Sequence, residues 1–117
     1  MAFKVTNVTR GKLLASSADE ATTFATRFMG LMGKKELPFG AGLHIVPCNS
    51  IHTFFMKIPI DAVFLDKEHK VVKVLHAMVP WRLSSLYFAA HSVLELPSGT
   101  SVASGTAEGD QLEFLPL

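Results

Sequence analysis

The spacing of hydrophobic and polar positions changes along this chain, and each spacing predicts a different kind of element. Residues 3–8 (FKVTNV) and 12–16 (KLLAS) are two short runs separated by Thr9, Arg10 and Gly11. A three-residue connection that ends in glycine is typical of a β-hairpin. The sequence therefore predicts that the chain opens with a hairpin.

A helical spacing follows the hairpin. Ser17 and Glu20 form a capping-box signature, and Gly33 suits a helix C-cap. The apolar residues between them recur every three or four positions, at Ala21, Phe24, Ala25, Phe28, Leu31 and Met32. This pattern predicts one main helix over about 18–32, with Arg27 at the edge of its apolar face.

From Gly40 onward the pattern becomes that of β-structure. Short runs rich in Val, Ile and Phe predict strands at 42–46, 50–56, 61–66, 70–79, 92–97 and 110–115. Residues 66–69 form a polar turn, residues 81–90 have no clear period and predict a long loop, and a short second helix is expected near 99–104. The predicted fold is α+β and β-rich, with a mostly antiparallel curved sheet or small barrel.

Composition narrows the class of protein. A chain of 117 residues, 49% hydrophobic and 18% charged, is expected to fold as a single domain over 1–117. The net charge is +1 and no basic run exceeds Lys34 and Lys35, so the sequence predicts neither nucleic-acid binding nor membrane association. The absence of an apolar leader or spanning run and the presence of one cysteine favour a cytoplasmic protein.

No cofactor or metal is indicated by the motifs. The sequence has no GxGxxG, Walker loop, GxSxG, HExxH or CxxC. His44, Cys48 and His52 are spaced four apart, but Pro47 argues against a helix there, and four residues of extended strand span roughly 13 Å. That distance is too long for one metal ion, so a site would need a turn over 47–50 and a fourth ligand.

The segment PCNSIHTFFM (47–56) suggests nucleophilic chemistry. Cys48 could act as a nucleophile, His52 as its base and Asp61 as the group that orients the histidine. The alternatives are structural: a free cysteine is commonly buried and inert, and a carboxylate within the apolar IPIDAVFL stretch suits a structural ion pair with Arg27, Lys57 or Arg82.

A second hypothesis is a ligand pocket near residues 47–61 and 81–82. Arg27, Lys57 and Arg82 would favour an anionic small molecule, and Trp81 could stack on it. Glu95 shares a strand face with Val93 and would join the site if that face lines a concavity. The complete set of expected ligand-binding residues is Arg27, Thr53, Met56, Lys57, Trp81, Arg82 and Glu95.

A family resemblance emerges from four stretches taken together. RFMGLMGKKELPFGAGLHIV, FFMKIPIDAVFLDKEHKVV, VLELPSGT and GDQLEF resemble a small ancient-conserved-region family of bacteria and archaea whose function is unknown. The recurring family residues fall here on Arg27, Gly30, Leu31, Met32, Gly42, Met56, Lys57, Pro59, Asp61, Asp66, Glu95, Gly109 and Asp110. PCNSIHT together with PWR resembles a sub-branch, which links Cys48 and His52 with Trp81 and Arg82. The resemblance implies a β-rich α+β domain.

Three functions follow as expectations. The first is a small binding module that uses the pocket described above. The second is a hydrolase or transferase that uses Cys48 and His52. The third is an interaction domain that uses an apolar patch of Leu83, Leu86, Tyr87 and Phe88 for a partner or for self-association, and the oligomeric state stays open.

Overall fold

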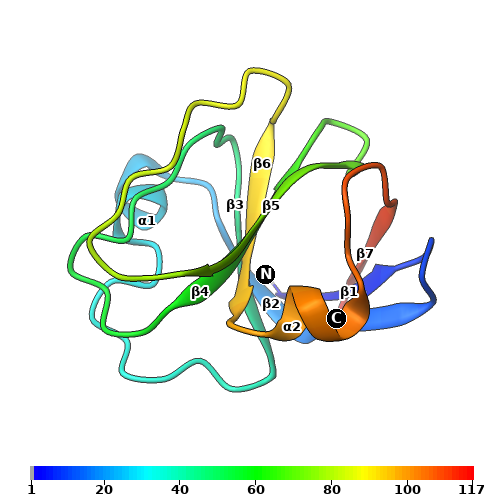
Figure 1. Cartoon of the computed structure of the whole chain (residues 1–117), viewed down its shortest axis with the longest axis horizontal. Coiled ribbons are helices and arrows are strands. Elements are labelled where there is room, and N and C mark those ends of the chain that lie inside the picture. Colours follow the sequence, from blue (N-terminus) through cyan, green and yellow to red (C-terminus); the bar gives the residue numbers. More distant parts are fainter. Residues whose placement is uncertain (1) are drawn as a thin grey trace.

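Seven strands form one curled sheet, with one short helix packed against it and another at one end of the molecule (Figure 1). The computed structural model describes residues 2–117. In chain order the elements are β1 (Ala2–Asn7), β2 (Lys12–Ala21), α1 (Phe24–Met29), β3 (Gly40–Ile45), β4 (Ile60–Leu65), β5 (Val71–Met78), β6 (Ser92–Pro97), α2 (Thr100–Ser104) and β7 (Leu112–Pro116). The strand order is β5-β4-β6-β3-β2-β1-β7. Only β2 and β3 pair in parallel, so the predicted β-rich, mostly antiparallel α+β fold is confirmed.

Two hairpins form where the sequence predicts them. The opening hairpin joins β1 and β2 and turns at Gly11, whose φ of +65° favours glycine. The second joins β4 and β5, and its turn is held by Asp66, whose Oδ1 accepts hydrogen bonds from the backbone N–H groups of Glu68 and Lys70 at 2.9 Å each. Such self-capping by an aspartate is the chemistry that makes a short polar run turn.

The main helix is much shorter than predicted, so the expected extent of 18–32 is wrong. Residues 18–21 of the predicted range belong to β2, which runs through Ala21 and pairs in parallel with β3. Ala18 pairs with Gly42, where a Cβ would lie 3.2 Å from the Glu95 carbonyl oxygen and from Leu96 Cδ2, tighter than an ordinary contact. The helix is capped by Thr23 and Thr26 instead of Ser17 and Glu20, through reciprocal side-chain to backbone bonds of 3.1 Å.

Residues 50–56 do not form a strand of the sheet, so that prediction is also wrong. They run beside the 81–88 segment, and the two are joined by backbone hydrogen bonds. Ser84 N–H donates to the Ile51 carbonyl at 2.9 Å, and Thr53 N–H donates to the Arg82 carbonyl at 2.8 Å. The long loop over 81–90 is present as predicted, and its irregular backbone is satisfied mainly by this second irregular segment.

The sheet buries a hydrophobic cluster on each of its faces. Along β6, Val93 packs with Ile45 and Phe64 on one face, whereas Leu94 packs with Val63 on the other. The alternation of side chains along a strand produces this division. Figure 1 shows α1 and the irregular segments 46–59 and 79–91 gathered at one end of the molecule, on the side of the Val93 cluster. The short helix predicted near 99–104 is confirmed as α2, and no helix among residues 2–117 is long and apolar enough to cross a bilayer.

Candidate functional site

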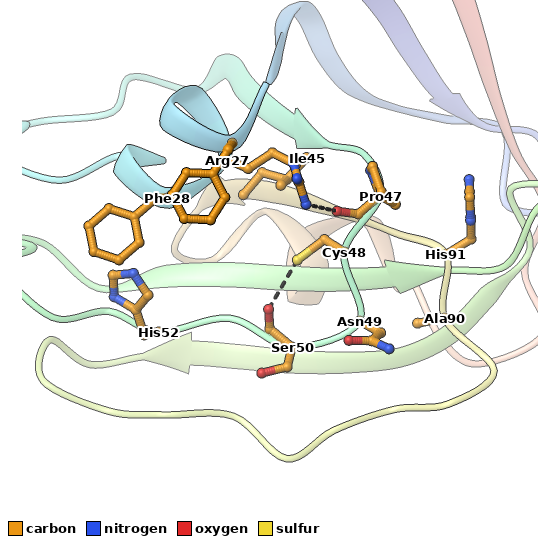
Figure 2. A pocket seen from close by; sticks show the side chains of 11 residues that line it. Arg27, Phe28, Ile45, Pro47, Cys48, Asn49, Ser50, His52, Ala90 and His91 are labelled. Atoms are coloured by element: carbon orange, nitrogen blue, oxygen red, sulfur yellow. Dashed lines mark hydrogen bonds between the residues drawn. The ribbon is translucent and has the colours of Figure 1, made fainter. Parts of the chain in front are cut away.

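A pocket of about 510 Å³ opens where the chain leaves β3, between α1 and the segment that follows the strand (Figure 2). The strand brings Ile45 to its wall, and α1 contributes Phe24, Arg27 and Phe28 from one side of the helix. The remaining lining residues are Pro47, Cys48, Asn49, Ser50, His52, Ala90 and His91. The pocket therefore combines an apolar wall with several polar groups, which is the usual composition of a small-molecule site.

A smaller chamber of about 50 Å³ adjoins the pocket beneath α1. The two cavities share six lining residues, Arg27, Phe28, Ile45, Cys48, Ser50 and His52. Deeper in, the chamber is lined by Met56 and Glu95, together with Gly30 at the end of α1. A space of this size accommodates roughly one or two waters or one small polar group.

Glu95 is the most unusual residue of the chamber. The side chain projects from β6 on the Val93 face, as the strand alternation predicts, and the residue is 2% exposed. Its Oε1 atom is buried and has no hydrogen-bond partner. Burial raises the pKa of this carboxyl from 4.5 to about 8, so at neutral pH it is mainly a neutral acid. Gly30 lies beside it, since a Cβ there would be in ordinary contact with Oε1 at 3.7 Å, and the φ of +47° at this position is what favours glycine.

Arg27 is the cation of the pocket. Its Nη1 donates a hydrogen bond to the carbonyl of Pro47 at 3.1 Å, which holds the guanidinium over the cavity (Figure 2). Its Nε is buried and has no partner. The side chain therefore keeps donors that are free to bind an oxygen of a ligand.

Cys48 lines both cavities, but its resting thiol is not activated. Sγ donates a hydrogen bond to the carbonyl of Ser50 at 3.0 Å (Figure 2). Burial raises the pKa of the thiol and the charge of Glu95 would raise it further, whereas the hydrogen bond with the Ser50 backbone and the charge of Arg27 act in the opposite direction and are outweighed. A nucleophilic cysteine requires a lowered pKa, so the local environment keeps this thiol protonated.

His52 reaches the same cavities without contacting the thiol. Its Nδ1 accepts a hydrogen bond from the backbone N–H of Phe54 at 3.2 Å, and its ring lies 5.5 Å from that of Phe28. No hydrogen bond joins it to Cys48 among residues 2–117. The structure thus brings both residues to one pocket and does not pair them.

Asp61 is separated from both, so the structure does not form the triad of Cys48, His52 and Asp61. It lies on β4 beside the Val63 cluster, on the face of the sheet opposite to Phe64 and the pocket. Oδ1 accepts from Ala77 N–H at 2.8 Å, while Oδ2 accepts from the N–H groups of Gly99 and Ser101 and from the Ser101 hydroxyl at 2.7–3.1 Å. The carboxylate thus fixes the entry to α2, and the expected ion pair with a cation is absent among the described residues.

Thr53, Trp81 and Arg82 also lie outside the pocket. The hydroxyl of Thr53 donates to the carbonyl of Val79 at 2.7 Å and accepts from the N–H of Arg82 at 2.9 Å, which ties the two irregular segments together. The Trp81 ring packs against Phe55 at 4.8 Å. Lys57 is exposed and lines neither cavity. Of the residues expected to bind a ligand, Arg27, Met56 and Glu95 line the cavities.

Several lining residues were not among the sequence candidates. Phe24 and Phe28 have helical spacing and are predicted as core, yet they are exposed and form the mouth of the pocket. Gly30 and His91 carry no motif of their own. The only signal that marks Gly30 is its place in the family pattern RFMGLM.

A second group of titratable side chains surrounds His44 on the opposite face of β3. Its Nδ1 lies 3.4 Å from Oε2 of Glu20, its ring packs 4.4 Å from Phe114, and its Nε2 is buried without a partner. Burial lowers the pKa of His44 to about 4, an effect that Glu20 opposes and the nearby His69 reinforces. No group of three or more His, Cys, Asp or Glu side chains in the described part of the chain could hold a metal ion.

The fold and the pocket define a small β-rich α+β domain with a cavity at one end of a curled sheet. Residues 5–114 match the model of the DUF192 family, described as "Uncharacterized ACR, COG1430". The chain belongs to this family, which confirms the resemblance seen in the sequence motifs.

Sequence relatives agree with this assignment, and two solved structures share the fold. The UPF0127 protein of Pyrococcus furiosus is 34% identical over 113 residues, which cover 92% of this chain and 95% of that protein. The UPF0127 protein of Thermococcus kodakarensis is 34% identical over 117 residues, which cover 96% of this chain and 73% of that protein. The fold is similar to the crystal structure of a protein of unknown function from Novosphingobium aromaticivorans, with a TM-score of 0.83 and 24% identity over 97% of this chain and 84% of that chain. It is also similar to the crystal structure of a protein from Sinorhizobium meliloti, with a TM-score of 0.81 and 20% identity over 97% of this chain and 92% of that chain.

Proposed function

We propose that the chain is a binding module for a small molecule that carries an anionic oxygen group next to an apolar portion. The observation that carries this proposal is the pair of adjoining cavities in which a buried carboxyl oxygen of Glu95 and a buried Nε of Arg27 both lack partners. Buried polar atoms are nearly always hydrogen-bonded, so two partnerless atoms on residues that line one chamber favour a site for the polar group of a ligand.

The charge of the site favours an anion. Arg27 is the only lysine or arginine that lines either cavity. Glu95 is mainly protonated at neutral pH, so it supplies a donor and does not repel a negative ligand. A carboxylate in the chamber would accept from both groups, and charge-assisted hydrogen bonds of this kind are the strong ones.

The walls favour an apolar portion on the same molecule. Phe24 and Phe28 stack at 6.4 Å on α1 and remain largely exposed at the mouth, while Ile45 and Ala90 line the interior. Aromatic surface of this kind binds ligand carbon by area burial and stacking. A molecule with a ring or short aliphatic chain ending in a carboxylate fits both parts.

A matched ligand series tests the proposal. Phenylacetate, phenylacetamide and 2-phenylethylamine share one ring and differ in the charge of the polar end. Titrated by isothermal calorimetry or NMR shift changes at pH 6.5, the anion should bind tightest. Arg27→Gln should weaken phenylacetate about 10- to 100-fold, the range for hydrogen bonds to a charged group.

Arg82→Gln is the matched control, because that guanidinium contacts the carbonyl of Trp81 and lies outside both cavities. It should leave the affinity for phenylacetate unchanged. Equal binding of the amine and the anion, or equal effects of the two arginine substitutions, would contradict the proposal.

An enzyme that uses Cys48 is the second candidate, and one observation favours it: the thiol lines both cavities. Catalysis would require the thiolate, whereas burial raises the pKa of the thiol and keeps the proton on sulfur in the unliganded chain. Binding is therefore the function that the site supports best.

A further inference from the structure

Six exposed or half-exposed rings form a continuous ridge beside the pocket. In order of contact they are Phe24, Phe28, His52, Phe54, Trp81 and Phe55, and successive ring centroids lie 6.4, 5.5, 5.2, 6.1 and 4.8 Å apart. We call this set the aromatic ridge. Phe24 is 79% exposed, Phe55 60% and Trp81 55%. Single exposed apolar residues are ordinary, but a contiguous set marks an interaction surface.

The ridge continues into aliphatic side chains. Leu83 pairs with His52 through an isolated β-bridge and is 68% exposed, and Met29 on α1 is also exposed. These groups bring carbon surface without hydrogen-bonding atoms to the same end of the molecule. The partner must therefore offer an apolar phase or an apolar face of its own.

The segments that form the ridge carry charges of a single sign, while the exposed Glu36 follows Lys35 directly and Asp19 and Glu20 line a hollow beside Met29 and Lys34. The ridge is built from the segments 21–35, 46–60 and 79–91, which contain no Asp or Glu at all. They contain five cations, Arg27, Lys34, Lys35, Lys57 and Arg82, whereas all ten acidic residues lie elsewhere in the chain. The net charge of +1 conceals this division, because Lys57 and Arg82 are far in sequence from Arg27, Lys34 and Lys35, and the fold gathers the three segments at one end (Figure 1).

We propose that the aromatic ridge and its cations form a docking surface for an anionic lipid bilayer, with the ridge side chains in the headgroup region. Aromatic and aliphatic side chains flanked by Lys and Arg are the composition of interfacial membrane binding. A second copy of this chain would bring like charges together. A single-stranded nucleic acid would need free ring faces for its bases, whereas the ridge rings pack on one another at 4.8–6.4 Å.

This surface differs from what linear charge runs alone predict. No contiguous polybasic segment exists in the sequence, and no described helix spans a bilayer. Attachment to the membrane surface requires neither a polybasic run nor a spanning helix. Each lysine or arginine near an anionic membrane raises the partition coefficient about fivefold. Phe24, Phe28 and His52 also line the pocket, whereas Trp81, Phe55 and Lys57 line neither cavity, so this second half of the surface can be tested separately from the proposed ligand.

Trp81 gives the experiment its probe, because it is the only tryptophan of the chain and lies within the ridge. The full chain is mixed with vesicles of phosphatidylcholine, with or without phosphatidylglycerol, and followed by tryptophan emission and co-sedimentation. The expected result is a blue shift and co-sedimentation with phosphatidylglycerol vesicles only, both reversed by added NaCl. Replacing Lys57 and Arg82 together by Gln should reduce partitioning about 25-fold.

Matched substitutions distinguish binding through the aromatic ridge from nonspecific hydrophobic adsorption to vesicles. Phe55→Ser should reduce partitioning, whereas Phe39→Ser should not, because Phe39 is 75% exposed but lies beside Lys12 and α2. Lys12→Gln is the corresponding charge control. No partitioning into phosphatidylglycerol vesicles would overturn the proposal, as would equal effects of the two Phe substitutions. Quenching of Trp81 by a dT oligonucleotide with no response to vesicles would overturn it in favour of nucleic acid.

Discussion

Replacing Glu95 by Gln should change how the stability of this protein depends on pH. The substitution keeps the size and shape of the side chain and removes the only titrating group that is fully buried in the chamber beneath α1. The glutamine amide also has an unpaired buried atom there, but its cost is the same at every pH. The change in stability between two pH values therefore isolates the carboxyl group.

The sign and size follow from the pKa of Glu95. Its folded value of about 8 lies above the ordinary value of 4.5, so the folded state holds the proton more tightly than the unfolded chain. The carboxyl is harmless to stability below pH 4.5, and stability is lost as pH rises from 4.5 to about 8. That interval spans about 3.5 pH units, and each unit corresponds to about 1.4 kcal/mol. The free energy of unfolding of the wild type therefore falls by about 5 kcal/mol over this interval, whereas that of Glu95→Gln does not.

Urea unfolding of both proteins at about pH 5 and about pH 9 measures this difference. The free energies of unfolding should be close at the lower pH, whereas Glu95→Gln should be more stable by several kcal/mol at the higher pH. His44 and every other titrating group are present in both chains, so their effects cancel. A gap that changes by less than about 1 kcal/mol between the two pH values would refute the conclusion that this acid is buried without a partner.

Three further predictions concern other residues. His44, whose pKa burial lowers from 6.5 to about 4, should make the protein less stable by about 3 kcal/mol as pH falls through that window, and unfolding of His44→Gln by urea should show a weaker loss. Cys48 should react with iodoacetamide more slowly than a free thiol, with its inflection above pH 9, and a faster rate at pH 7 would contradict its burial. Asp61→Ala leaves four donors unpaired and should cost about 3 kcal/mol or more in thermal unfolding, whereas an unchanged Tm would argue against its role at α2.

Local patterns predicted the hairpins and most of the strands, but not the irregular segment 50–56, because alternation and turn residues act over a few positions. The opening hairpin, the turn at Asp66 and the short helix α2 all follow from neighbouring residues. The main helix was overextended because Ala18 and Glu20 are good helix formers, and tertiary pairing overrode that preference. The close approach of Ala18 to Gly42 in the parallel β2–β3 pair depends on a residue 24 positions later, which no local window includes.

The candidate site was predicted in part for a similar reason. Glu95 was placed on the Val93 face by strand alternation, and that face does line a cavity. Asp61 was one hypothetical partner of His52, but alternation along β4 turns it to the other face. The role of Phe24 and Phe28 could not be predicted, since an apolar helical stripe looks the same whether it packs on a core or borders an open pocket.

The hydrogen bonds between segments 47–56 and 79–91 have a consequence for protein engineering. The hydroxyl of Thr53 donates to the Val79 carbonyl and accepts from the Arg82 N–H, so the conformation of each segment depends on the other. Transferring only one of these segments into a relative would leave its backbone N–H and C=O groups without hydrogen-bond partners. The two segments must therefore be exchanged together, while β3, β4 and β6 remain those of the recipient protein.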